Sequence, residues 1–131
     1  MEQRNINPWK WQDQYGFSQG IEVSNASRVL YCAGQASVDD KGKPVHVGDM
    51  RKQIEQAFRN LETVLIASGF GLADVVRLNY YTTDVDGFLS ASDVVGKRLA
   101  EAACQPSGTL LGVSKLAFPG LMIEIEATAA K

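Results

Sequence analysis

The feature that most constrains the fold is residues 48–83, because their pattern predicts a long helix followed by a strand. Asp49 can cap the start of this helix, and Gly69 can end it in a left-handed conformation. Between them, apolar residues recur at steps of three and four and share one helical face: Met50, Ile54, Ala57, Phe58, Leu61, Val64 and Leu65. Residues 75–83 are rich in β-branched and aromatic side chains, as strands are. The apolar helix face needs a sheet to cover, and this strand is the nearest candidate.

The flanking segments predict further strands and a second helix. Residues 17–23 alternate in polarity and residues 29–33 form an apolar run, which together predict a β-hairpin. Asp86 can cap a second helix, since apolar residues follow it at helical spacing: Phe88, Ala91, Val95, Leu99 and Ala102. Residues 109–113 and 121–129 predict two more strands.

The predicted order is therefore ββαβαββ, a fold of the α+β class in which two helices cover one face of a mixed sheet. Residues 1–131 are expected to form a single domain, because the length suits one core and no linker or repeat interrupts it. The other face of the sheet has no cover from this chain. Several of its residues are expected to be apolar or aromatic, which favours self-association through that face.

Composition excludes several classes of partner. A net charge of −2 argues against nucleic acid, which usually requires a basic surface. No run is long and apolar enough for a membrane, and the polar start of the chain does not resemble a signal peptide, so a cytoplasmic protein is expected. His46 is the only histidine and the two cysteines lie far apart, so no metal site is expected.

Several short motifs give the chain a resemblance to a known family. They follow one another in the family's order along nearly the whole chain: Phe17-Ser18-Gln19, Tyr31-Cys32-Ala33-Gly34-Gln35, Asn60-Leu61, Ser68-Gly69, Asp74-Val75-Val76-Arg77, Thr83-Asp84, Asp86 with Phe88, and Ile123-Glu124-Ile125-Glu126-Ala127. In these motifs the chain resembles the RidA/YjgF-like reactive-intermediate deaminases. The resemblance implies a chorismate-mutase-like fold and a homotrimer whose three sheets form a central barrel, with small-molecule clefts between subunits.

The resemblance also implies an activity, the hydrolysis of enamines and imines such as 2-aminoacrylate without a metal or organic cofactor. In the family pattern Pro-Ala-Arg-Ser, the arginine holds the substrate carboxylate, but here Gly108 occupies its position. Phe17 stands at a usual tyrosine, Ala33 at a usual serine and Ser92 at a usual asparagine. Activity on 2-aminoacrylate is therefore expected to be weak or absent. A roomier, more apolar pocket with a neutral or weakly polar ligand is expected instead.

Glu124 matches the glutamate of the family's cleft, which is thought to act with a bound water. The backbone carbonyl near Leu110 is expected to help hold that water, and Gly34 falls at the cleft beside Ala33. On pattern alone, Glu124 and Glu126 are simply the outward residues of an amphipathic strand. Arg77 and Lys115 are the candidate replacement cations, although each also fits a solvated surface residue. Cys104 follows the second helix, but no base beside it is evident.

Two functions of different classes follow from these residues. One is a diverged enamine or imine hydrolase in which Glu124 acts as an acid or base with a bound water. The alternative is a non-catalytic protein that holds a small metabolite in the same clefts. A ribonuclease, an older label for the family, fits least, because the chain is acidic and has no pair of histidines.

Overall fold

The computed structural model describes all residues, 1–131. Its strands and helices follow one another in this order: β1 (Glu2–Ile6), η1 (Trp11–Tyr15, a 3-10 helix), β2 (Gly20–Ser24), β3 (Val29–Tyr31), β4 (Gln35–Ala36), α1 (Met50–Ala67), η2 (Leu72–Asp74, a 3-10 helix), β5 (Val75–Thr82), α2 (Val85–Ser90), α3 (Ser92–Glu101), β6 (Leu110–Gly112) and β7 (Ile123–Ala130). The predicted α+β class with a mixed sheet is confirmed.

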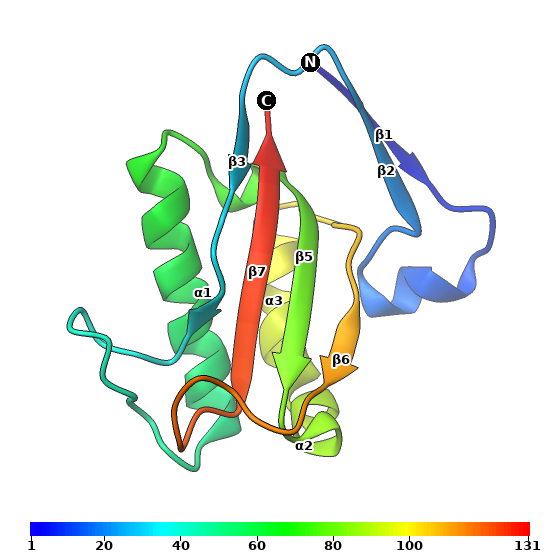
Figure 1. The fold of residues 1–131 in the computed structure, drawn as a ribbon. Helices are drawn as coiled ribbons and strands as arrows, with labels where there is room; N and C mark the ends of the chain where they lie inside the picture. Colours follow the sequence, from blue (N-terminus) through cyan, green and yellow to red (C-terminus); the bar gives the residue numbers. More distant parts are fainter.

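The main sheet has the strand order β3-β7-β5-β6, and β4 also pairs with β7 (Figure 1). The two long strands β5 and β7 form its antiparallel centre, from Arg77 opposite Thr128 to Thr82 opposite Ile123. At the edge, β6 runs parallel to β5. The sheet therefore contains both kinds of pairing, as predicted.

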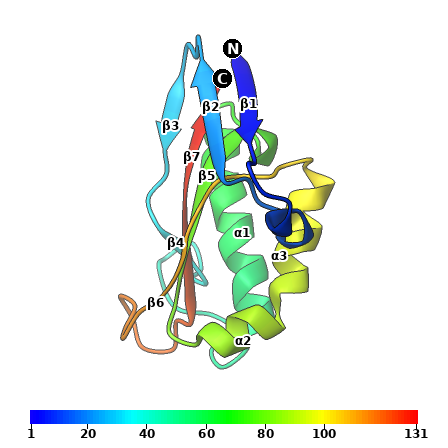
Figure 2. The same cartoon turned by 90° about the vertical axis from the view of Figure 1, so that its right-hand side faces the viewer.

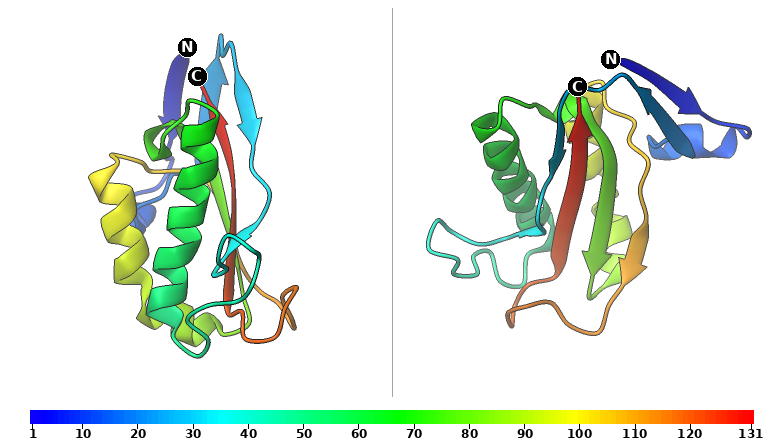
Figure 3. Two further views of the ribbon diagram at one scale, coloured as in Figure 1. Left: turned by 90° about the vertical axis from the view of Figure 1, so that its left-hand side faces the viewer. Right: turned by 45° about the horizontal axis from the view of Figure 1, so that its top comes forward.

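The helices α1 and α3 lie side by side on one face of this sheet (Figures 2 and 3). The backbone N–H of Lys52 donates to the Asp49 carboxylate at 3.0 Å, so Asp49 caps α1 as predicted. Gly69 follows the helix with a φ of +77°, the left-handed conformation that was expected. The predicted apolar face of α1 is buried against the sheet, apart from the half-buried Val64.

Side chains along β5 and β7 alternate between the two faces of the sheet. Leu78 and Ile125 point into the core beneath the helices and are almost fully buried. The opposite face, here called the open face, carries mostly polar residues from these two strands: Arg77, Asn79, Tyr81, Glu124, Glu126 and Thr128. Large exposed apolar or aromatic residues on this face lie at its margins, such as Tyr31 on β3 and Leu111 on β6. The apolar and aromatic residues expected on this face are therefore present, as Tyr81 at the centre and Tyr31 and Leu111 at the margins, but most of the central residues are polar.

The predicted β-hairpin between residues 17–23 and 29–33 is wrong. The strand β2 pairs instead with the N-terminal strand β1, from Glu2 opposite Ser24 to Ile6 opposite Gly20. The strand β3 pairs with β7. The β1–β2 ribbon stands apart from the main sheet (Figure 1). Since β1 is polar and largely exposed, no alternating pattern marks it in the sequence.

The second helical segment also differs from the prediction. It divides at Ala91 into α2 and α3, and Asp84 caps it, because the Asp84 carboxylate accepts from the N–H of Gly87 at 3.0 Å. Asp86 lies within the first turn. The predicted buried stripe is nevertheless present, from Phe88 to Leu99. No helix combines the length and the apolar composition that crossing a membrane requires.

Candidate functional site

The seven predicted site residues fall into two groups on opposite sides of the sheet. The first group belongs to the open face and consists of Ala33, Gly34 and Glu124. The second group lines a cavity on the helix side and consists of Phe17, Ser92, Gly108 and Leu110. The division follows from strand geometry, because Tyr80 borders the cavity and its neighbour Tyr81, opposite Glu124, points the other way.

In the open-face group, Gly34 and Glu124 are in direct contact. The chain turns from Gly34 into β4, where Ala36 pairs with Glu124. A Cβ atom at Gly34 would lie 1.9 Å from Oε1 of Glu124, so the carboxylate occupies the space that glycine leaves. The Glu124 side chain is half-buried and makes no hydrogen bond or ion pair within the chain. Its carboxylate oxygens are therefore available to water or a ligand.

Glu126, two residues further along the same face, is engaged by its neighbours. The Tyr81 hydroxyl donates a short hydrogen bond to Oε1 of Glu126, and Nδ2 of Asn79 donates to the same atom at 3.2 Å. The bond to Glu126 raises the pKa of Tyr81, because the carboxylate favours the protonated phenol. Asn79 in turn accepts from the N–H of Thr109 at 3.1 Å. This carboxylate therefore ties β7 to β5 and the start of β6.

The cavity on the helix side has a volume of about 960 Å³ and lies between η1, the α2–α3 segment and residues 104–110. Four aromatic residues border it: Tyr15, Phe17, Tyr80 and Phe88. The rings of Tyr80 and Phe88 lie 5.3 Å apart at their centroids, and Trp11 supports Phe17 from outside at 5.8 Å. The volume is in the range of small-molecule sites. Tyr15 and Tyr80 were not predicted as site residues, because only the tertiary fold brings them to the same cavity.

Gly108 lies against the backbone of the neighbouring strand. A Cβ atom at this position would lie 1.9 Å from the carbonyl oxygen of Leu78, while the N–H of Leu78 donates to Ser107 at 2.8 Å. Gly108 does not adopt a positive φ, so a left-handed backbone conformation is not the reason for glycine. The reason is the close approach of two main chains. An arginine cannot be placed here unless these strands move apart.

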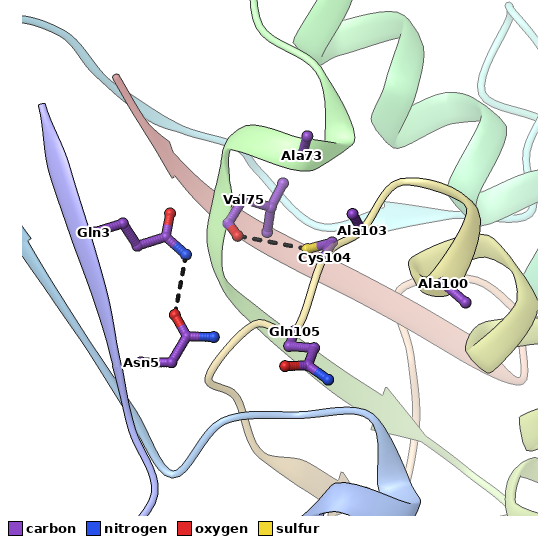
Figure 4. Close-up of a pocket in the computed structure, with 8 residues that line it drawn as sticks. All are labelled: Gln3, Asn5, Ala73, Val75, Ala100, Ala103, Cys104 and Gln105. Atoms are coloured by element: carbon purple, nitrogen blue, oxygen red, sulfur yellow. Dashed lines mark hydrogen bonds between the residues drawn. The ribbon is translucent and has the colours of Figure 1, made fainter.

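A second cavity, of about 380 Å³, lies between the β1–β2 ribbon and the end of α3 (Figure 4). Gln3 and Asn5 border it from β1 and are hydrogen-bonded to each other at 3.4 Å. Cys104 borders both cavities, and its thiol donates to the carbonyl of Val75 at 3.6 Å. Burial raises the pKa of Cys104 to about 11, so this thiol stays protonated at neutral pH and lacks thiolate reactivity.

Comparison with known proteins agrees with this fold and these motifs. Residues 12–131 match the family described as Endoribonuclease L-PSP. A RutC family protein of Pyrococcus horikoshii is 32% identical over 115 residues, which cover 88% of this chain and 86% of that protein. A 2-iminobutanoate/2-iminopropanoate deaminase of Dermatophagoides farinae is 29% identical over 100 residues, which cover 76% of this chain and 74% of that protein.

Solved structures of related proteins share this fold. A protein of unknown function of the conserved Rid family from Yersinia pestis, YyfB, superimposes with a TM-score of 0.87 at 34% identity, over 100% of both chains. RidA from the Antarctic bacterium Psychrobacter sp. PAMC 21119 gives a TM-score of 0.69 at 28% identity, over 88% of both chains. The chain therefore belongs to the Endoribonuclease L-PSP family, whose members include the RidA/YjgF-like proteins.

Proposed function

We propose that this protein is a homotrimer that binds a small carbonyl, enamine or imine compound in clefts between subunits, and that it hydrolyses the bound imine or enamine. Support for a shared cleft comes from the separation of the two residue groups. Gly34 and Glu124 lie on the open face, whereas Phe17 and Gly108 border the cavity on the other side. Contact between two copies is the simplest way to bring a carboxylate of one subunit to the cavity of another.

The proposed reaction needs one group that moves protons. Glu124 accepts a proton from a water, whose oxygen adds to the imine carbon and forms a carbinolamine. The carboxylic acid then returns the proton to the carbinolamine nitrogen, and as the carbon–nitrogen bond breaks, the carboxylate takes up the proton of the hydroxyl group and passes it to the leaving ammonia. A protonated imine and one water thus give a carbonyl compound and an ammonium ion. An enamine follows the same route after a proton adds to its carbon. The related deaminase from Dermatophagoides farinae carries a name that describes this class of reaction.

The observation that carries this proposal is the contrast between the two carboxylates of the open face. Glu124 has no partner within the chain, whereas Glu126 accepts hydrogen bonds from Tyr81 and Asn79. A proton-transferring group needs free oxygens, and both carboxylate oxygens are free in Glu124, whereas Oε1 of Glu126 is occupied by two donors.

The test measures ammonia release from an imine generated in solution by an amino-acid oxidase. Glu124→Gln is expected to lower the rate by about 100-fold or more, because general acid–base catalysis contributes that much. Glu126→Gln is the matched control and should leave the rate nearly unchanged. Light scattering after size exclusion should report about three chains per particle. A monomer, or a Glu124→Gln variant with the native rate, would contradict the proposal.

The alternative, a binding protein without chemistry, is favoured by Gly108. The resemblance places a carboxylate-binding arginine at this position, and the contact with Leu78 leaves no room for any side chain. Activity on 2-aminoacrylate is accordingly expected to be weak. Tight binding of a carbonyl compound with equal ammonia release from the native protein and Glu124→Gln would favour the binding protein.

A further inference from the structure

The charged residues that line the large cavity are all negative. Among the residues that line it, only Asp13 and Asp93 carry a charge, and neither Arg77 nor Lys115 is among them. Arg51, outside the cavity, offsets the charge of Asp93 through two hydrogen bonds of 2.9 and 2.7 Å. Asp13 accepts only a hydrogen bond of 3.0 Å from the neutral amide of Gln12. The cavity thus has one uncompensated carboxylate and no cation.

The aromatic walls add to this negative character. Tyr15 and Phe17 come from the segment that also holds Asp13, while Tyr80 comes from β5 and Phe88 from α2. The face of an aromatic ring is the negative part of its quadrupole, so rings around a pocket attract cations. Burial strongly raises the pKa of Tyr80, so its phenol stays neutral at physiological pH and contributes as a ring.

We infer that the cavity binds a small organic cation with an apolar body, a protonated amine or iminium compound that has no carboxylate. This inference rests on the proposed function for the identity of the site. It assigns a cationic substrate where the sequence predicted a neutral or weakly polar one, because Asp13 and four aromatic residues border the cavity. A carboxylate ligand would lie near the negative charge of Asp13 with no cation among the lining residues, so the two like charges would repel each other. Gly108 cannot supply the missing cation, because a side chain there meets the carbonyl of Leu78.

The charge of such a ligand also suits the proposed chemistry. A protonated imine is more electrophilic at carbon than a neutral imine, so water adds to it more readily. Hydrolysis of the iminium ion consumes one water and gives one neutral carbonyl compound and one ammonium ion. The neutral product loses its attraction to Asp13 and the rings, which favours its release.

The test compares three ligands with one ring and different charges at pH 7.5: 2-phenylethylamine, 2-phenylethanol and phenylacetate. Calorimetry on the native protein is expected to show the amine binding about ten-fold more tightly than phenylacetate, a difference typical of cation–π and carboxylate contacts. Asp13→Asn should weaken amine binding about two- to five-fold. The same variant should leave 2-phenylethanol unaffected. Asp86→Asn is the matched control, because Asp86 is an exposed residue that does not line the cavity.

Binding of phenylacetate as tight as that of the amine, or tighter, would overturn the inference. Equal losses of amine affinity in Asp13→Asn and Asp86→Asn would also overturn it. So would the absence of binding for all three ligands at 10 mM, which corresponds to a binding free energy weaker than about 3 kcal/mol. The binding comparison needs no turnover, so it separates the two proposals. Amine selectivity without ammonia release from any imine would retain this inference and reject the hydrolase. Ammonia release without amine selectivity would reject this inference and retain the hydrolase.

Discussion

The two glycines of the candidate site exclude a side chain for different reasons. At Gly34, the space for a Cβ atom is filled by the carboxylate of Glu124, the far end of a flexible side chain. At Gly108, the same space is filled by the carbonyl oxygen of Leu78, which belongs to the main chain of β5. In both cases the Cβ atom would lie 1.9 Å from the oxygen. Only the group at Gly34 can move aside without disturbing the sheet.

This difference predicts that substitutions at the two glycines affect different properties of the protein. A substitution at Gly34 pushes on the carboxylate that we propose to be catalytic, so its effect should appear in activity. A substitution at Gly108 pushes β5 away from residues 107–109, so its effect should appear in stability. Substitution of Gly34 is thus expected to lower activity, whereas substitution of Gly108 is expected to lower stability.

The largest expected effect is on the stability of Gly108→Ala. The added methyl group meets a main-chain oxygen, and overpacking of this kind costs about 1–3 kcal/mol of unfolding free energy. Urea denaturation followed by circular dichroism measures it. Gly96→Ala in α3 is the control, because no atom lies within 4 Å of its Cβ position and alanine favours helices. If Gly108→Ala unfolds at the same urea concentration as the native protein, the close approach to Leu78 does not explain the glycine.

A smaller change in stability but a clear loss of activity is expected for Gly34→Ala. The methyl group displaces the Glu124 carboxylate, and a displacement of about 1 Å can cost about 100-fold in rate. Unfolding free energy should change by less than about 1 kcal/mol, since the side chain can rotate away. Gly20→Ala is the control, because its Cβ atom would make an ordinary contact of 3.7 Å with Ile6. Ammonia release at the native rate would contradict this prediction.

The smallest effect is expected in a double-mutant cycle that pairs Gly34→Ala with Glu124→Ala. Removing the Glu124 side chain vacates the space that the new methyl group needs. The cost of Gly34→Ala should therefore disappear in the Glu124→Ala background, with a coupling of about 0.5 kcal/mol. Denaturation of the four proteins measures this term. Strict additivity would show that the carboxylate does not occupy this space in solution.

The parts of the fold that could be predicted from sequence are those with one buried face. The helix α1, its cap at Asp49 and the strand β5 follow from patterns that packing enforces. The ribbon partner β1 has no buried face, so nothing in its sequence marks it as a strand. The break at Ala91 lies inside a continuous apolar stripe, and the stripe cannot distinguish one helix from two.

The candidate site divides in the same way. The position of Glu124 on the face opposite the core follows from alternation alone, since Ile123 and Ile125 are buried. Its contact with Gly34 and the engagement of Glu126 depend on pairings between distant strands. The reason for Gly108 lies in the carbonyl of Leu78, thirty positions earlier, and no local pattern contains it.

The close approach of Gly108 to Leu78 also limits the substitutions that this position can accept in evolution. A single codon change to arginine would collide with the main chain before the new charge could serve a ligand. A chain that acquires an arginine here must therefore first acquire changes that widen the gap. The order of mutations, and not only their identity, restricts which substrates its descendants can reach.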